Sequence, residues 1–178
     1  MKFGFQMDPV STLNHSTDST LPMILESQKR KNQNYIFSPS SLTFKKSSLY
    51  AQAKEIKFKN DKLNSYTLSS EKKLNLNSLN YIFIRQDPPY DMEYISSMHL
   101  LEQLSEKTKV VNSPSGIRNA PEKILMLKFK NIIPPTLITR SKKEIDRFMN
   151  SYKKSVIKPL YGNGGQGIFL LDKNDKNY

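Results

Sequence analysis

The chain has 178 residues, with 28 Lys and Arg against 16 Asp and Glu, which leaves a net charge of +12, and it contains no cysteine. The lack of cysteine excludes disulfides and thiolate metal sites, no apolar run approaches the ~20 residues of a membrane-spanning helix, and the first residues turn polar too soon for a signal peptide. The positive charge invites a nucleic-acid interface, but the lysines are scattered and arginine, the better reader of bases, is rare. Composition therefore favours a soluble cytoplasmic protein and disfavours a nucleic-acid or membrane partner.

The first 40 residues predict the opening of a parallel α/β sheet. Residues 2–7 form a strand, and a polar loop then leads to Asp18 or Ser19, either of which can cap a helix. The helix extends to about residue 30, and residues 34–37 form a second strand. A strand, a loop, a helix and a strand in this order are typical of a parallel sheet.

The region after this unit predicts a hairpin and then a loop. No glycine ends the first helix; Lys31 and Asn32 stand there instead, and Asn suits that position. Residues 42–59 alternate apolar and polar side chains, which predicts a β-hairpin that turns near Ser47. Residues 60–78 are polar and predict a mobile loop.

A second strand and helix follow. Residues 81–85 (YIFIR) predict a buried strand, Asp91 caps the next helix, and residues 109–112 predict a short strand. The apolar face of the helix comprises Tyr94, Ile95, Met98, Leu101 and Leu104.

The C-terminal third alternates helices and strands. Asn119 and Glu122 have the spacing of a capping box, which predicts a short helix to about residue 129, and Ser141 and Glu144 repeat this spacing before a further helix. The inward face of that helix comprises Ile145, Phe148, Met149 and Tyr152, and its solvated end carries Lys153 and Lys154. Strands are predicted at residues 136–139, 155–160 and 168–172.

A glycine-rich loop joins the last two predicted strands. It contains four of the six glycines of the chain, Gly162, Gly164, Gly165 and Gly167. A P-loop or a dinucleotide fingerprint would lead into a helix, whereas IFLL after this loop predicts a strand. Two interpretations stay open: a long hairpin turn, or a lid whose backbone N–H groups fold over a triphosphate, with Lys158 on the strand below.

Arg85 ends a predicted parallel strand, at the sheet edge where ligands bind in open α/β folds. Its guanidinium could bind a substrate carboxylate with two parallel hydrogen bonds, or it could form an ion pair with Asp87 or Asp91. The first βα loop opens at the same edge and contributes three more candidates, whose plainer roles are turn and cap: Asp8, Asn14 and Ser19.

Five stretches resemble, in this order, the bacterial glutathione synthetases of the ATP-grasp superfamily. They are FQMDP (5–9), RQDPPYD (85–91), VNSPSGIRNAPEK (111–123), PPTLITR (134–140) and KPLYGNGGQG (158–167). The resemblance covers essentially the whole chain, but the family continues well beyond it. It implies an α/β fold with an N-terminal parallel-sheet, Rossmann-like (pre-ATP-grasp) domain at residues 1–120, followed by the first, incomplete lobe of an ATP-grasp domain at 121–178.

The resemblance also implies an activity, the ATP-dependent ligation of γ-glutamylcysteine and glycine through an acyl phosphate. Such chemistry needs positioning and charge neutralisation rather than a catalytic acid or base. The implied ATP-binding residues are Lys123, Lys158, Gly162, Asn163, Gly164, Gly165 and Gly167. The substrate-binding candidates are Arg85, Asp87, Asp8, Asn14 and Ser19.

The family uses Mg²⁺, and we expect its ligands in the C-terminal lobe that this chain lacks. The chain alone is therefore expected to be inactive. A non-catalytic nucleotide-binding or scaffold remnant of the same fold is the alternative, and the resemblance leaves a homo-oligomer open.

Overall fold

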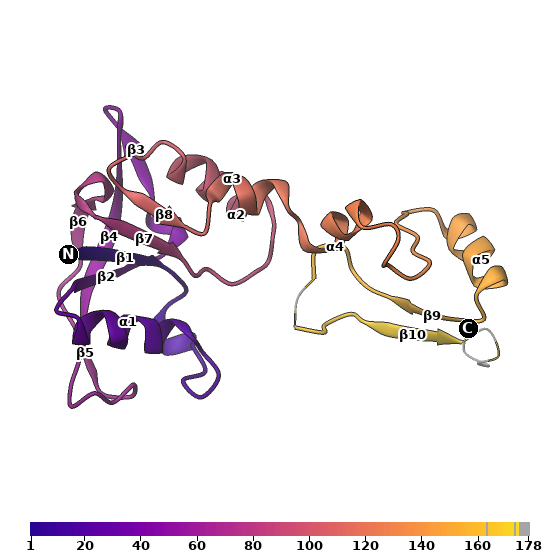
Figure 1. Cartoon of the computed structure of the whole chain (residues 1–178), viewed down its shortest axis with the longest axis horizontal. Coiled ribbons are helices and arrows are strands. Elements are labelled where there is room, and N and C mark those ends of the chain that lie inside the picture. The colour runs from indigo at the N-terminus through magenta and orange to yellow at the C-terminus, as the bar shows by residue number, and fades with distance from the viewer. Residues whose placement is uncertain (163, 173, 175–178) are drawn as a thin grey trace. The chain divides into compact units, whose positions relative to one another are not determined.

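A computed structural model describes residues 1–162, 164–172 and 174, and the chain folds into two compact units (Figure 1). The first unit comprises Met1–Asp87 and Asp91–Asn119, and the second comprises Pro88–Tyr90 and Ala120–Tyr178. The predicted division into a pre-ATP-grasp domain at residues 1–120 and an incomplete ATP-grasp lobe at residues 121–178 stays a prediction.

The first unit is built on a mixed sheet. Its strands are, in chain order, β1 (Lys2–Gln6), β2 (Gln33–Phe37), β3 (Thr43–Lys45), β4 (Ser48–Phe58), β5 (Tyr66–Leu68), β6 (Lys72–Asn75), β7 (Tyr81–Ile84) and β8 (Lys109–Val111). The spatial order is β3-β4-β2-β1-β7-β8, and β5 and β6 also pair with β4. Strands β2, β1, β7 and β8 are parallel, whereas β4 is antiparallel to β2. The predicted parallel-sheet α/β fold is therefore confirmed.

Helices cover both faces of this sheet. They are α1 (Thr20–Lys29), α2 (Met92–Leu101) and the short α3 (Pro114–Asn119). Phe5 belongs to the same buried cluster as Ile24 of α1, whereas the side chain of Gln6 reaches Ser97 of α2. Because successive residues of a strand point to opposite faces, α1 and α2 lie on opposite sides of the sheet.

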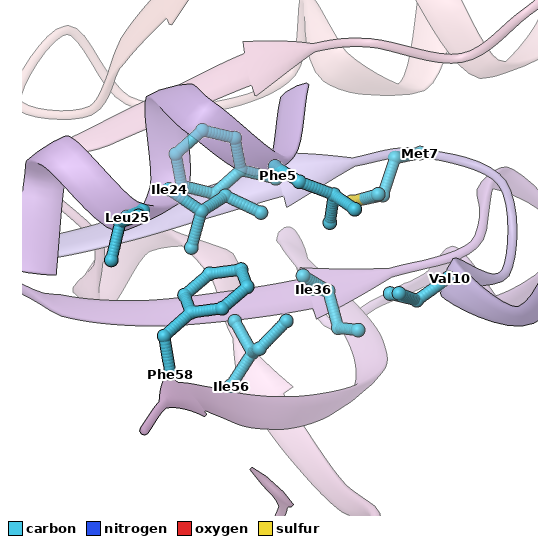
Figure 2. Close-up of a cluster of buried hydrophobic side chains, with 9 residues drawn as sticks. Phe5, Met7, Val10, Ile24, Leu25, Ile36, Ile56 and Phe58 are labelled. Atoms are coloured by element: carbon cyan, nitrogen blue, oxygen red, sulfur yellow. The ribbon is translucent and has the colours of Figure 1, made fainter. Parts of the chain in front are cut away.

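The core beneath α1 is apolar and holds the first βα loop in place (Figure 2). It comprises Phe5, Met7, Val10, Leu21, Ile24, Leu25, Ile36, Ile56 and Phe58. Val10 lies in the loop that follows β1, and its side chain is buried with the residues of β1, β2 and β4. Removing its apolar surface from water therefore anchors the loop that carries Asp8 and Asn14.

The prediction of a mobile loop at residues 60–78 is wrong. Strand β4 has 11 residues, enough to pair with β6 along its first half and with β5 near its end. Leu76 follows β6 in a short 3₁₀ turn and is fully buried. Strand pairing satisfies backbone groups whatever the side chains are, so a polar stretch can extend an existing sheet.

The end of α1 also differs from expectation, because Lys31 rather than Asn32 takes the left-handed conformation. Lys31 has φ 61°, its N–H donates to Gln28 O (2.8 Å), and the N–H of Asn32 donates to Ser27 O (3.2 Å). This pair of hydrogen bonds is the Schellman motif, whose left-handed position favours glycine.

Lys31→Gly should therefore stabilise the protein. Relief of the left-handed strain is worth roughly 1–2 kcal/mol, and the added freedom of glycine in the unfolded chain offsets part of this, so we expect a gain of about 0.5–1 kcal/mol. Lys29→Gly, two residues earlier inside α1, should instead cost about 1 kcal/mol. Urea unfolding of the two variants measures both changes, and a loss of stability in Lys31→Gly would contradict this explanation of the helix end.

The described part of the second unit contains two α-helices and a two-stranded sheet. They are α4 (Glu122–Leu125), α5 (Lys142–Ser151), β9 (Lys154–Ile157) and β10 (Phe169–Asp172). Strands β9 and β10 are antiparallel, with Ile157 opposite Phe169. The predicted strand after the glycine loop is confirmed. No helix among the described residues is long and apolar enough to cross a membrane.

Both predicted capping boxes are wrong. Asn119 ends α3, a helix that the sequence did not predict, and α4 begins after Pro121 without a side-chain cap. Ser141 does stand before α5, but its side chain makes no capping hydrogen bond, and Glu144 pairs with Arg147 instead. The spacing permits a capping box but does not enforce it, because an i,i+3 ion pair competes for the same glutamate.

Three smaller predictions in this unit are also wrong. Residues 136–139 form no strand, since β propensity needs a neighbouring strand to pair with and none lies beside them among the described residues. Tyr152 is exposed and lies beyond the end of α5, whereas Met149 is buried. Lys154 is the first residue of β9 rather than part of a solvated helix end.

Candidate functional site

Arg85 lies where the sequence placed it, directly after β7, and its N–H donates to Gln6 O (2.7 Å). Its guanidinium donates to two hydroxyls at the start of α1, from Nη2 to Ser19 Oγ (2.7 Å) and from Nε to Thr20 Oγ1 (3.1 Å). Among the described residues, neither Asp87 nor Asp91 forms an ion pair with Arg85. Neutral hydroxyl oxygens thus orient the guanidinium group but do not neutralise its positive charge.

The start of α1 explains why Ser19 can accept from Arg85. Asp18 Oδ1, not Ser19, caps the helix, since it accepts from the N–H groups of Thr20 and Leu21 (2.8 Å each). The Ser19 side chain makes no capping hydrogen bond. Of the two predicted caps, Asp18 does this work and leaves the Ser19 hydroxyl at the sheet edge.

Asp8 and Asp87 also meet at this edge. Asp8 Oδ2 accepts from the backbone N–H of Asp87 (2.8 Å), which ties the loop after β1 to the segment after β7. Asn14 plays a different part: its Oδ1 accepts from the N–H and the hydroxyl of Ser16 (3.1 and 2.6 Å) within its own loop. The structure therefore brings Asp8, Ser19, Arg85 and Asp87 into one edge, while Asn14 shapes the loop.

A buried polar group beneath this edge was missed from the sequence. Gln6 is 0% exposed, and its Nε2 donates to Gln86 Oε1 (2.8 Å) and to Ser97 Oγ (3.4 Å). These bonds fix the residue that follows Arg85 against α2. A glutamine inside the apolar strand KFGFQM was the available signal, because a buried polar side chain needs partners.

The glycine loop connects β9 to β10. Gly164, Gly165 and Gly167 have φ values of 59°, 78° and 68°, a region that favours glycine. At Gly167 space matters too, because a Cβ would lie 2.8 Å from Pro159 Cγ. At Gly164 and Gly165 a Cβ would meet nothing within 4 Å, so the tip of the loop is open. Asn163 lies outside the described residues.

The two predicted ATP-binding lysines differ in their surroundings. Lys123, on α4, is half-buried, and its Nζ donates to the backbone carbonyls of Pro159 (2.7 Å) and Gly162 (2.6 Å). Lys158 is exposed and lies between β9 and the loop. The structure thus joins Lys123 to the glycine loop. It places Lys158 at the start of that loop rather than on the strand that the sequence predicted, because β9 ends at Ile157.

The base of the two-stranded sheet carries an ion pair. Lys154 Nζ lies 3.3 Å from Asp172 Oδ2, across the register pair formed by these two residues. The backbone N–H of Asn174 and the Lys154 ammonium lower the pKa of the Asp172 carboxyl. Asp172 is therefore a structural partner of Lys154 at neutral pH. Across the described part of the chain, no three His, Cys, Asp or Glu side chains gather in a way that could hold a metal ion.

Comparison with known families assigns both parts of the chain. Residues 1–118 match the family described as prokaryotic glutathione synthetase, N-terminal domain, and residues 122–178 match prokaryotic glutathione synthetase, ATP-grasp domain. The two matches agree with the fold implied by the motifs of the sequence.

Curated relatives give the same result. Proteins named glutathione synthetase from Agrobacterium fabrum and Vibrio vulnificus are 41% and 34% identical to this chain over 98% and 99% of its length. The relative from Buchnera aphidicola is 33% identical over 100% of the chain. These alignments cover 55% or 56% of each relative, so the chain spans about half the length of the proteins that it matches. On both the domain matches and these relatives, the chain belongs to the prokaryotic glutathione synthetase family.

Proposed function

We propose that this chain supplies the N-terminal half of a glutathione synthetase, which uses ATP to join γ-glutamylcysteine to glycine. The observation that supports this most is the contact of the Lys123 ammonium with the base of the glycine loop, inside the stretch that matches an ATP-grasp domain. A cation at the base of a glycine-rich loop suits a polyphosphate, since both the charge and the exposed N–H groups stabilise phosphate oxygens.

The nucleotide side of the proposed site is the loop with its two lysines. Lys158, exposed at the start of the loop, and Lys123, half-buried beneath it, would neutralise phosphate oxygens. Backbone N–H groups at Gly162, Gly164, Gly165 and Gly167 would approach the phosphates closely, because glycine has no Cβ in the way. We include Asn163 in this set on the family motif.

The substrate side is the sheet edge around Arg85. A guanidinium that is oriented by Ser19 and Thr20 can offer its remaining N–H groups to a carboxylate of γ-glutamylcysteine. Asp8 and Asp87 hold the two loops of this edge together and could accept from the substrate amine, while Asn14 keeps the first loop in shape.

The proposed reaction has two steps. The carboxylate of the cysteine residue in γ-glutamylcysteine attacks the γ-phosphate of ATP. This step releases ADP and forms an acyl phosphate. The amine of glycine then attacks the acyl carbon, forms the amide bond and expels phosphate, with one proton lost to solvent. The residues of this chain would position and neutralise the reactants and need not exchange protons with them.

Three parts of the proposal go beyond this chain. Mg²⁺ would supply charge neutralisation for the phosphates, but the described residues do not offer a ligand set for it, so we place its ligands in the C-terminal part of the intact enzyme. We also propose a cytoplasmic location. The proposal holds for a monomer and for a homo-oligomer of the intact enzyme.

Glutathione formation tests this function. Residue 178 is fused to the part of the Agrobacterium fabrum glutathione synthetase that lies beyond the aligned region; we call this fusion the completed protein. It should form glutathione and ADP in equal amounts, and only when ATP, γ-glutamylcysteine and glycine are all present. The 178-residue chain alone should form none.

Two results would go against the proposal. Glutathione made by the 178-residue chain alone would show that the C-terminal half is dispensable. A folded completed protein that binds ATP but makes no glutathione would favour a non-catalytic nucleotide-binding or scaffold role.

A further inference from the structure

Lys123 binds the backbone at the base of the glycine loop. Its Nζ donates to Pro159 O at 2.7 Å and to Gly162 O at 2.6 Å, across 36 and 39 positions of sequence. These carbonyls belong to the first and last residues of a four-residue turn, 159–162. Hydrogen bonds from an ammonium are roughly twice as strong as those between neutral groups, so this lysine ties α4 to both ends of that turn.

Pro159, at the start of the loop, also contacts Gly167 near the end of the loop. Gly167 approaches it so closely that a Cβ would lie 2.8 Å from Pro159 Cγ, and a Cβ on Gly162 would lie 3.3 Å from Pro159 Cβ. The loop therefore has a packed base around Pro159, whereas its tip at Gly164 and Gly165 has open space. Lys123 is the charged group that holds this base.

The donor count of an ammonium leaves room for a ligand. Lysine has three N–H donors and no acceptor, and the two carbonyls use two of them. A phosphate oxygen could take the third donor without breaking the turn.

We propose that Lys123 is a positioning residue, which holds the base of the glycine loop in its folded shape before the nucleotide arrives. A turn that is shaped in advance loses less conformational entropy when a ligand binds to it. The ligand part of this inference rests on the proposed function, whereas the contact of Lys123 with Pro159 and Gly162 does not depend on it.

Chymotrypsin cleavage after Tyr161 tests the clamp in the 178-residue chain without nucleotide. Tyr161 is 53% exposed and lies inside the clamped turn. Lys123→Met keeps the length of the side chain but removes its donors, so cleavage after Tyr161 should accelerate at least about fivefold, because proteolysis follows the population of the opened state. Lys128→Met, at an exposed lysine five positions later, should leave the rate unchanged.

Cleavage after Phe44 is the internal reference. Phe44 is 47% exposed and lies in the first unit, so its rate should be the same in all variants and reports that this unit is folded. Cleavage after Tyr161 at the same rate in Lys123→Met, Lys128→Met and the unchanged chain would overturn the proposal.

A spectroscopic readout does not depend on that variant being folded. In ¹⁵N spectra of lysine ammonium groups, the Lys123 signal, assigned by its loss in Lys123→Arg, should exchange its protons more slowly than the other lysine signals. Exchange as fast as that of Lys128 would overturn the clamp. Because neither experiment contains ATP, a failure of nucleotide binding would count against the proposed function and not against this role of Lys123.

Discussion

Replacing Lys158 by Ala should weaken ATP binding to the completed protein about tenfold to a hundredfold, since a hydrogen bond to a charged group contributes about 1.5–3 kcal/mol and each ~1.4 kcal/mol is a factor of ten. Lys158 is exposed at the start of the glycine loop, where we propose that its ammonium contacts a phosphate of ATP. Lys158→Arg should restore binding only in part, because a planar guanidinium does not replace a compact ammonium beneath a closed loop. Isothermal titration with a non-hydrolysable ATP analogue measures the change.

Lys153 is the matched control for this experiment. It is exposed, and it lies between the end of α5 and the start of β9. Lys154 is not suitable, because its ion pair with Asp172 joins β9 to β10 and its loss could disturb the loop indirectly. Equal ATP affinity in Lys158→Ala and Lys153→Ala would reduce the glycine loop to a hairpin turn.

Arg85→Ala should raise the KM for γ-glutamylcysteine in the completed protein by roughly a hundredfold, because it removes the proposed charge-assisted contact to the substrate carboxylate. The KM for ATP should stay within about twofold, since the proposed nucleotide contacts come from Lys123, Lys158 and the glycine loop. The KM of Arg85→Lys for γ-glutamylcysteine should lie between those of the unchanged protein and Arg85→Ala. Lysine keeps the charge but loses the forked guanidinium that Ser19 and Thr20 orient.

Arg30→Ala serves as the control for the loss of an arginine. Arg30 follows α1 at its other end and forms an exposed pair with Glu26, so its removal should change neither KM. Urea unfolding should accompany the kinetics, because Arg85 also braces the start of α1. A normal KM for the dipeptide in a stable Arg85→Ala protein would place the substrate carboxylate elsewhere.

Much of the first unit could be predicted from sequence because its strands are short apolar runs between clear breaks. YIFIR and KFGFQM fall on β7 and β1, and the hairpin turns at Lys46 and Ser47, which both have positive φ. Residues 60–78 were not predictable in this way. Their pairing depends on the length of β4, a property of a partner strand rather than of their own composition.

In the candidate site too, the position of a residue could be predicted from its type and neighbours, whereas its contacts depend on distant residues. The position of Arg85 after a parallel strand predicted that it lies at the carboxyl edge of the sheet, and Asp8 and Ser19 lie there too. The sequence favoured no hydroxyl partner for its guanidinium, because Ser19 is available only when Asp18 takes over the cap. Lys123 looked structural without the family motif, and only the fold shows that it reaches across 36 residues to the loop.

Oxygen-18 transfer measures most directly whether the completed protein joins nucleotide and dipeptide in the proposed way. γ-Glutamylcysteine labelled with ¹⁸O in the carboxylate of its cysteine residue should donate one ¹⁸O to the released phosphate for each glutathione formed. The reason is that one carboxylate oxygen links carbon to phosphorus in the acyl phosphate and leaves with the phosphate. Arg85→Ala and Lys158→Ala should slow this transfer and leave its ratio of one unchanged. Glutathione formed with no ¹⁸O in phosphate, or with ¹⁸O in AMP, would contradict phosphoryl transfer to the carboxylate and with it the proposed role of the glycine loop.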